Sequence, residues 1–316
     1  MNLDEIAARY VYKAEDLVPI NDGFQNTVYQ LGNHHVLRMG EGNRRNINEL
    51  ENEMKFILFL DNMQIPVSKP IPSNNGQLIE KVENIHIVAF EKANGAAIEV
   101  TDPNVWNTDL FHQWGKLIGK MHKVSNLIDL DRPRWTEEDP DILKLLPKIS
   151  SHPIRQRYIE QLEELKSFKQ DLNLFGLIHN DFHQGNFFVK DGRITFFDFD
   201  DCAYHWFAYD LAVSFYHAYW QASSFTPEQT DFSKIFWCHF LKGYREEHDI
   251  NREMIEQIPI FLKIREIFLY VLFLEKWDLQ NLKDWQTFTL EDLKHKIGNN
   301  LPYSNVDFNE LIDNIS

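Results

Sequence analysis

The strongest constraint on the fold is a change of hydrophobic periodicity about a third of the way along the chain. In the first part, β-rich runs form two pairs separated by short turns, as antiparallel hairpins require: 27–31 with 35–39, and 77–82 with 85–91. Between the pairs, the apolar residues of 46–62 recur with a helical period. The predicted order of elements is therefore strand, strand, helix, strand, strand.

From about residue 93 onward the periodicity is mainly helical, and it predicts helices at 105–121, 154–165, 229–247 and 253–281. The chain of 316 residues is about twice the roughly 150 residues of a single domain. We therefore expect two domains, 1–92 and 93–316, joined by a short hinge near 90–96. The predicted fold class is α+β, with a small antiparallel sheet first and a larger helical domain after it.

Charge and hydropathy exclude several functional classes. The net charge of −16 argues against a nucleic-acid partner, which requires clustered Lys and Arg. The longest apolar run, 267–274, is far shorter than the about 18 residues of a membrane span. Asp4 and Glu5 stand where a signal peptide would be basic. We therefore expect a cytoplasmic protein that binds neither membrane nor nucleic acid, while the sequence leaves its oligomeric state open.

A polar cluster interrupts the helical part. The run 179–186, His-Asn-Asp-Phe-His-Gln-Gly-Asn, lies between two apolar strands, and Asp198 follows Asn186 by twelve residues across a hairpin. Because a hairpin brings its ends together, Asn186 and Asp198 can share one Mg²⁺ ion, which prefers oxygen ligands. Asp181 is near enough in sequence to this pair to accept a proton from an incoming hydroxyl.

Two other interpretations of this cluster are open on the residues alone. In the first, His179, Asp181 and Asn186 only cap turns by bonding to backbone amides. In the second, His179, Asp181 and His183 bind zinc. A loop between strands does not provide the helix face on which histidines four residues apart converge, which weakens the zinc hypothesis.

The spacing H-x-D-x-H-x-x-N over 179–186, followed by an apolar strand and Asp-Phe-Asp at 198–200, resembles the catalytic and metal-binding loops of the aminoglycoside phosphotransferase and choline kinase family, relatives of the protein kinases. The resemblance implies a two-lobed protein-kinase-like fold with ATP between the lobes. It also implies roles for four residues: Asp181 as catalytic base, His183 as the cation that touches the transferred phosphate, and Asn186 and Asp198 as Mg²⁺ ligands.

The first part of the chain matches the same template. The segment 22–26, which contains Gly23 and Asn26, resembles the turn that covers the nucleotide, although it holds a single glycine. Phe90 and Glu91 match the hinge whose backbone amide and carbonyl meet adenine. The resemblance therefore implies that these four residues help to bind ATP.

Arg38 occupies the place of the family's lysine that pairs with the α- and β-phosphates. The replacement keeps the charge and supplies a planar fork of donors for phosphate oxygens. Glu53, on the following helix, matches the residue that holds this cation, although Glu49 and Glu51 lie near enough to take its place. A surface arginine with a solvated glutamate is the alternative.

Three acids follow the metal loop. Asp210, in Tyr-Asp-Leu-Ala, matches the family's aspartate that braces the backbone of the catalytic loop. Asp200 stands where protein kinases have glycine, and Asp200 or Asp201 could join the metal shell or face an amine of the substrate. The sequence does not choose between these two roles.

The resemblance implies a phosphotransferase that uses ATP and Mg²⁺ to phosphorylate a hydroxyl of a small amino alcohol, amino sugar or similar metabolite. Residues beyond 220, which match the family least well, choose the acceptor. Glu275, Trp277 and Asp278 suit an amine-bearing acceptor, and Arg265 suits a substrate carboxylate.

Other functional classes stay open beside this hypothesis. Asp198-Phe199-Asp200 also resembles the nucleophile motif of haloacid dehalogenase phosphatases, but Cys202 stands where that motif has Thr, and no alternating βα units follow. A pseudokinase-like module that only binds nucleotide would have lost the base or the metal ligands, whereas this chain retains them. A kinase acting on a protein hydroxyl is the remaining alternative.

Overall fold

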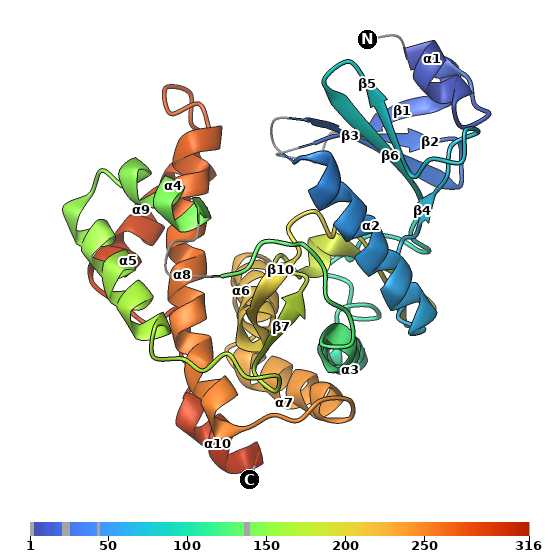
Figure 1. The fold of residues 1–316 in the computed structure, drawn as a ribbon. Helices are drawn as coiled ribbons and strands as arrows, with labels where there is room; N and C mark the ends of the chain where they lie inside the picture. Colours follow the sequence, from blue (N-terminus) through green and yellow to red (C-terminus); the bar gives the residue numbers. More distant parts are fainter. Residues whose placement is uncertain (1–2, 21–25, 43–44, 136–139, 316) are drawn as a thin grey trace. The chain divides into compact units, whose positions relative to one another are not determined.

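The computed structural model describes residues 3–20, 26–42, 45–135 and 140–315 (Figure 1). Its contacts divide the chain into two compact units, neither of which is one continuous stretch. The first unit contains residues 1–98, 127–132 and 185–202, and the second contains 99–126, 133–184 and 203–316. The division of the chain at residue 92 stays a prediction. The hairpin after the polar cluster packs with the first unit, although it lies far along the chain.

An antiparallel sheet forms the centre of the first unit. Its strands are β1 (Leu17–Ile20), β2 (Thr27–Leu31), β3 (His35–Glu41), β4 (Pro70–Ile71), β5 (Ile79–Val82) and β6 (Ile85–Glu91). They pair in the order β1-β2-β3-β6-β4, with β5 also on β6. Buried Leu37, Met39 and Ile87 form the core between this sheet and α1 (Leu3–Ala8).

Helix α2 (Ile47–Asn62) follows β3 and is defined at its start by a capping box. The side chain of Asn46 accepts a hydrogen bond from the backbone N–H of Glu49, and the Glu49 carboxylate accepts one from the backbone N–H of Asn46. Its buried face includes Glu53, between apolar residues. Beside these elements, the hairpin of β8 (Phe187–Lys190) and β9 (Arg193–Phe196) bonds through Phe196 to the backbone at Pro66 and Ser68.

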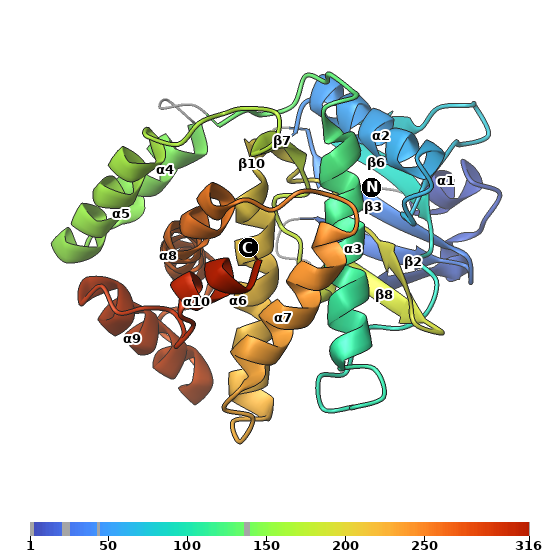
Figure 2. The same cartoon turned by 90° about the horizontal axis from the view of Figure 1, so that it is seen from below.

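The second unit is mainly helical, and glycines allow two of its helices to pack closely. Figure 2 shows α3 (Thr108–Ser125) and α7 (Phe232–Arg245) side by side. A Cβ atom on Gly115 would lie 1.9 Å from the carbonyl oxygen of Phe240, and one on Gly243 would lie 1.9 Å from that of His112. Side chains at these two positions would force the helices apart.

The second unit also contains a two-stranded sheet and further helices. Strands β7 (Phe175–Ile178) and β10 (Ala203–Trp206) pair antiparallel, and β10 leads directly into the buried helix α6 (Phe207–Phe225). Helix α8 (Arg252–Lys276) packs against α6. The other helices are α4 (Pro140–Lys148), α5 (His152–Leu165), α9 (Asp284–Gly298) and α10 (Phe308–Ile315), with short 3₁₀ turns at Ala14–Asp16 and Gln184–Asn186.

The predicted hairpins, the helix between them and the four later helices are confirmed within a few residues at their ends. The elements that were not predicted from the sequence are strands β1, β4 and β10 and helices α1, α4, α6, α9 and α10. Within the described residues, none of the helices combines the length and the apolar composition that a membrane crossing requires.

Candidate active site

The predicted base lies on a loop that Asp210 holds in place. This loop follows β7, and Asp210 lies in the first turn of α6. Its carboxylate accepts hydrogen bonds from the backbone N–H groups of His179, at 3.0 Å, and Asn180, at 2.8 Å. Asn180 has a left-handed backbone with φ of 73°, which is costly for a residue other than glycine. The bracing contact predicted for Asp210 is confirmed, and it stabilises the turn from which Asp181 projects.

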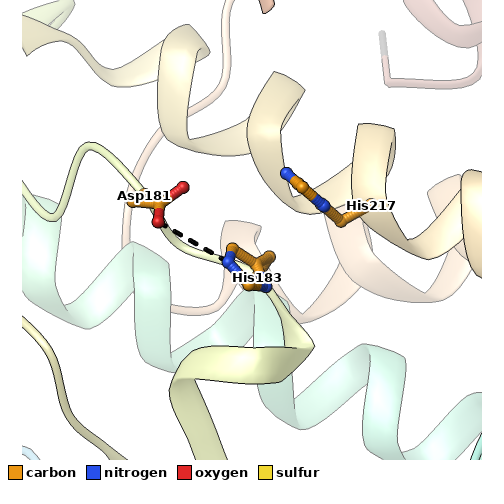
Figure 3. Close-up of side chains that lie close together, drawn as sticks. All are labelled: Asp181, His183 and His217. Carbon is orange, nitrogen blue, oxygen red and sulfur yellow. Dashed lines mark ion pairs between the residues drawn. The ribbon is translucent and has the colours of Figure 1, made fainter. Parts of the chain in front are cut away.

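Asp181 lies beside the imidazole side chains of His183 and His217 in the second unit (Figure 3). Its Oδ1 accepts a hydrogen bond from Nη2 of Arg265 at 2.5 Å, and its Oδ2 lies 3.6 Å from Nε2 of His183. Nη2 of Arg265 also lies 2.8 Å from Nε2 of His217. The rings of His183 and His217 stack with centroids 4.3 Å apart. The structure thus places the two predicted residues Asp181 and His183 beside Arg265 and His217.

Two opposing effects set the pKa of Asp181. Burial raises it, but the Arg265 guanidinium and the His183 imidazole hold the pKa of this carboxyl well below its usual range. Burial, with His183 and Arg265 nearby, lowers the pKa of His217 well below its usual range. The site therefore offers an ionised carboxylate, beside a neutral imidazole, that can orient and deprotonate a hydroxyl.

The ligand atoms of Asp181, His183 and His217 lie within 4.8 Å of one another, close enough for a metal ion. In the described part of the chain this cluster contains His217, and not the His179 of the zinc hypothesis. Arg265 already supplies a cation to Asp181 and His217. The contacts of Arg265 also differ from the expected contact with a substrate carboxylate, since its guanidinium is buried against Asp181.

Sequence reasoning missed His217 entirely. It lies 48 residues from Arg265 and 34 from His183 along the chain, so no local motif connects it to the loop. The available signal was a histidine in a mostly apolar segment, since α6 is buried over most of its length. A polar side chain on such a helix requires a partner.

Arg38 and Glu53 form a two-pronged ion pair in the first unit. Nη1 and Nη2 of Arg38 lie 2.8 and 2.7 Å from Oε1 and Oε2 of Glu53. Burial lowers the pKa of Arg38, but the surrounding carboxylates, Glu53 foremost, raise it, so the guanidinium stays charged. Glu49, Glu51 and Glu53 were the three candidate partners of Arg38. The structure pairs Arg38 with Glu53, whereas Glu49 caps the start of α2.

The predicted metal ligands occupy the two ends of the β8–β9 hairpin. Phe187 pairs with Phe196, and the backbone N–H of Phe197 donates to the carbonyl of Asn186 at 3.0 Å. Asp198 follows in a left-handed conformation with φ of 65°, and its Oδ1 lies 3.7 Å from Nη1 of Arg38. An amide oxygen and a half-exposed carboxylate are a donor set that fits Mg²⁺.

Asp200 and Asp201 face Arg45. Nη2 of Arg45 lies 2.6 Å from Oδ1 of Asp201, and its Nε lies 3.6 Å from Oδ1 of Asp200. Asn26, predicted to cover the nucleotide, donates from Nδ2 to Oδ2 of Asp200 at 3.2 Å. Asn26, Arg38, Arg45 and Asp200 also line a small pocket. These contacts give both acids a protein cation as partner.

The predicted hinge residues end strand β6. Phe90 pairs with Val36 of β3, and its ring lies beneath the Arg38 guanidinium, 5.2 Å from ring centroid to Cζ. The backbone N–H of Glu91 donates to the carbonyl of Lys69, so this amide is already satisfied. Its carbonyl accepts from the Ser68 hydroxyl and retains a second lone pair. Gly23 lies outside the described residues.

The acids proposed for an amine-bearing acceptor have local partners. Glu275 lies 2.9 Å from Nζ of Lys148, and Asp278 accepts from Asn281 at 2.7 Å. The aromatic side chains nearby form a continuous row. It begins at His217, beside Asp181, and continues through contacting rings to an exposed tryptophan: Trp220, Phe273, Trp277 and Trp285.

Comparison with known proteins gives a consistent result. Residues 16–246 match the model of the phosphotransferase enzyme family. The amicoumacin kinase of Bacillus subtilis (strain 168) is 30% identical over 325 residues, which cover 98% of this chain and 95% of the relative.

Solved structures share the fold over almost the whole chain. An amicoumacin kinase in complex with AMP-PNP, Ca²⁺ and Ami has a TM-score of 0.89 and 29% identity, covering 98% of this chain and 96% of its own. A microcompartment-associated aminopropanol kinase has a TM-score of 0.73 and 19% identity, covering 93% and 94%. The predicted α+β protein-kinase-like fold is thereby confirmed, and the phosphatase and zinc hypotheses are set aside.

Proposed function

Since this chain belongs to the phosphotransferase enzyme family and is a kinase for a small-molecule hydroxyl, we propose that it transfers the γ-phosphoryl group of ATP with the help of Mg²⁺. The acceptor we propose is an amine-bearing alcohol of the amicoumacin or amino-sugar type. The observation that carries this proposal is the pairing of Arg38 by Glu53 in the first unit together with an ionised Asp181 in the second.

At the nucleotide end, Arg38 neutralises phosphate oxygens. A guanidinium suits this role because it keeps its charge and presents parallel N–H donors. Glu53 fixes the fork from behind, and Asn26 and Gly23 cover the phosphates. The adenine ring of ATP contacts the backbone of the Phe90–Glu91 segment, where the Glu91 carbonyl has a second lone pair for a hydrogen bond.

Asn186 and Asp198 hold the Mg²⁺ ion through their side-chain oxygens. A bound Mg²⁺ supplies positive charge that offsets the charge developing on the phosphate oxygens. Arg38, 3.7 Å from Asp198, contributes a second fixed positive charge at the same carboxylate. Asp200 and Asp201 do not complete the metal shell in this proposal, because they pair with Arg45.

At the acceptor end, Asp181 orients the hydroxyl and receives its proton. Positioning and electrostatics account for most of the catalysis of phosphoryl transfer, so the orientation of this carboxylate matters more than its basicity. In this proposal His183, whose Nε2 lies 3.6 Å from Oδ2 of Asp181, contacts the transferred phosphoryl group. The aromatic row from Trp220 to Trp285 offers ring faces to a cationic or flat acceptor.

The direct test is coupled ADP release with Mg²⁺ and ATP across amicoumacin, aminoglycosides, aminopropanol, choline, ethanolamine and homoserine. Stimulation by one compound, with a phosphate ester found by mass spectrometry, supports the proposal. Trp220→Leu should then raise the KM for that acceptor and leave the KM for ATP unchanged, whereas Phe225→Leu, at an exposed position of the same helix, should change neither.

Two outcomes would redirect the proposal. If no small molecule stimulates ADP release while ATP binds in a Mg²⁺-dependent manner, the acceptor lies outside the panel, and a protein hydroxyl becomes the next candidate. If neither ATP nor GTP binds, the proposed use of a nucleotide donor is wrong.

A further inference from the structure

We propose that Arg265 and His217 are positioning residues which fix the orientation of the Asp181 carboxylate and hold it in its ionised form. This inference rests on the proposed function, because it assigns the supporting residues of the proposed base. Neither residue belongs to the loop that carries Asp181. Both come from helices, Arg265 from α8 and His217 from α6.

The hydrogen bonds fix the protonation state of His217. A guanidinium has N–H donors and no acceptor, so Nε2 of His217, 2.8 Å from Nη2 and 3.3 Å from Nε of Arg265, must accept. The imidazole is therefore neutral, with its proton on Nδ1. A protonated ring would lose this bond and place a second positive charge against Arg265.

Arg265 is buried among acceptors and is not available to a ligand. Its guanidinium contacts Asp181 and His217. Its side chain is only 6% exposed and packs against the ring of Phe268. The positive charge of Arg265 therefore acts on Asp181 and His217 rather than on a bound ligand.

The two oxygens of Asp181 have different surroundings. Oδ1 accepts the short bond from Arg265, and Oδ2 lies 3.6 Å from Nε2 of His183. In the reaction, the acceptor O–H bond breaks and its proton moves to the Asp181 carboxylate. The oxygen electron pair forms the new bond to phosphorus as the bond from phosphorus to the β–γ bridging oxygen breaks and ADP leaves.

The groups that face Asp181 determine how it titrates. They are Arg265 from α8, His217 and Tyr209 from α6, and His183 from its own loop. Of these, Arg265 is the one with a permanent charge. Removing that charge should raise the pKa of Asp181, because an adjacent positive charge favours the ionised carboxylate.

The experiment compares Arg265→Met, which keeps the side-chain bulk, with Arg265→Lys, which keeps the charge. In Arg265→Met, kcat should fall roughly 10- to 100-fold through misplacement of the base, with the KM for ATP unchanged. Its kcat should also fall with decreasing pH in a range where the wild-type kcat is flat. Arg265→Lys should retain the wild-type pH profile, since the cation remains.

His217 is tested by a matched pair of variants. His217→Phe keeps an aromatic ring to stack on His183 but removes the acceptor of the Arg265 bond, and kcat should fall. His217→Gln provides an amide oxygen at a similar distance from the backbone and should recover part of the loss. Equal activity of the two variants would contradict a role that depends on the hydrogen bond.

A second readout needs neither acceptor nor turnover. In protein labelled with ¹³C at aspartate carboxyl groups, the signal lost in Asp181→Asn identifies this residue. We expect it to stay ionised to the acid limit of folding in the wild type and to titrate at higher pH in Arg265→Met. Equal titration in both proteins would overturn the inference even if the enzyme is active, and a shifted titration would support it even if every tested acceptor fails.

Discussion

Two arginine–carboxylate pairs, one in each unit, differ in which member is more deeply buried. The more deeply buried member is the carboxylate in the first unit and the arginine in the second. In the first unit, the carboxylate of Glu53 is 0% exposed and Arg38 is 9% exposed. In the second, Arg265 is 6% exposed and Asp181 is 28% exposed. In each pair the more accessible member is the one we assign to a substrate, phosphate for Arg38 and a hydroxyl for Asp181. The buried member fixes its position and charge.

The comparison shows why such pairs are costly and still useful. Removing two charges from water costs roughly several kcal/mol per ion. The attraction between the two charges offsets this cost only when their geometry is good. A buried pair is thus weak evidence for stability. A charge that is already desolvated and oriented needs no rearrangement when the substrate arrives, which favours catalysis.

The largest effect is expected for the exposed member of the second pair. Asp181→Asn should lower kcat by about 10²- to 10⁴-fold, the usual contribution of a general base, and leave the affinity for MgATP nearly unchanged. Initial rates and nucleotide titrations measure both quantities. A variant that keeps most of its activity would remove Asp181 from the role of base.

The next effect concerns the buried member of the first pair. Glu53→Gln removes the carboxylate that forms both short bonds to the buried Arg38 and should lower the free energy of unfolding by about 3–5 kcal/mol, measured by urea denaturation. The double variant Arg38→Met with Glu53→Met should recover most of the stability but none of the nucleotide affinity. If Glu53→Gln unfolds like the wild type, the pair is not the desolvated fork that the structure describes.

The support of the Asp181 loop gives a smaller effect. Asp210→Asn replaces one of two acceptor oxygens by a donor, so one of the N–H groups of His179 and Asn180 loses its partner, at a cost of about 1–3 kcal/mol. Activity should fall while MgATP affinity is kept. Ser214→Ala, which removes a neutral bond to the carbonyl of Phe182 in the same loop, is the control and should change activity less.

A buried carboxylate without an arginine completes the comparison. Glu266 on α8 is fully buried, and its cation partner, Lys263, lies 3.6 Å away. Burial raises the pKa of Glu266 from 4.5 to about 7, against the lowering effects of Lys263 and Lys296. Between these two values the folded state keeps a proton that the unfolded state releases, so this group makes stability decrease as pH rises from 4.5 to about 7.

Glu266→Gln should remove that decrease. The free energy of unfolding, measured by urea at pH values on either side of this window, should depend less on pH in the variant than in the wild type. Glu256→Gln, at an exposed position of α8, should leave the pH dependence as it is. An unchanged slope in Glu266→Gln would mean that this carboxylate is ionised despite its burial.

Local patterns were sufficient to predict the elements that position the first pair. Arg38 lies on a strand with a clear hairpin signal, and Glu53 lies on the helix that follows it. The loop of Asp181 was likewise predicted, because its polar residues stand between two short apolar strands. Each of these signals lies within a few tens of residues.

The supporting residues of the second pair could not be predicted in this way. The contact between Arg265 and Asp181 spans 84 residues, and its meaning depends on the packing of α6 against α8. Helix α6 itself was missed because it is buried on nearly all sides and therefore lacks the polar face that gives a helix its periodicity. Burial lets these residues fix the position and charge of Asp181. It also removes the alternation of polar and apolar residues from which a helix is predicted.

The division of labour between the two pairs is tested most directly by titrating Mg²⁺ and AMP-PNP into four variants, Arg38→Met, Glu53→Gln, Asp181→Asn and Arg265→Met. This measurement needs no acceptor. We expect the first two variants to bind the nucleotide much more weakly than the wild type and the last two to bind it with nearly wild-type affinity. Equal weakening in all four, or full affinity in Arg38→Met, would contradict the separation of a phosphate-binding pair from a hydroxyl-activating pair.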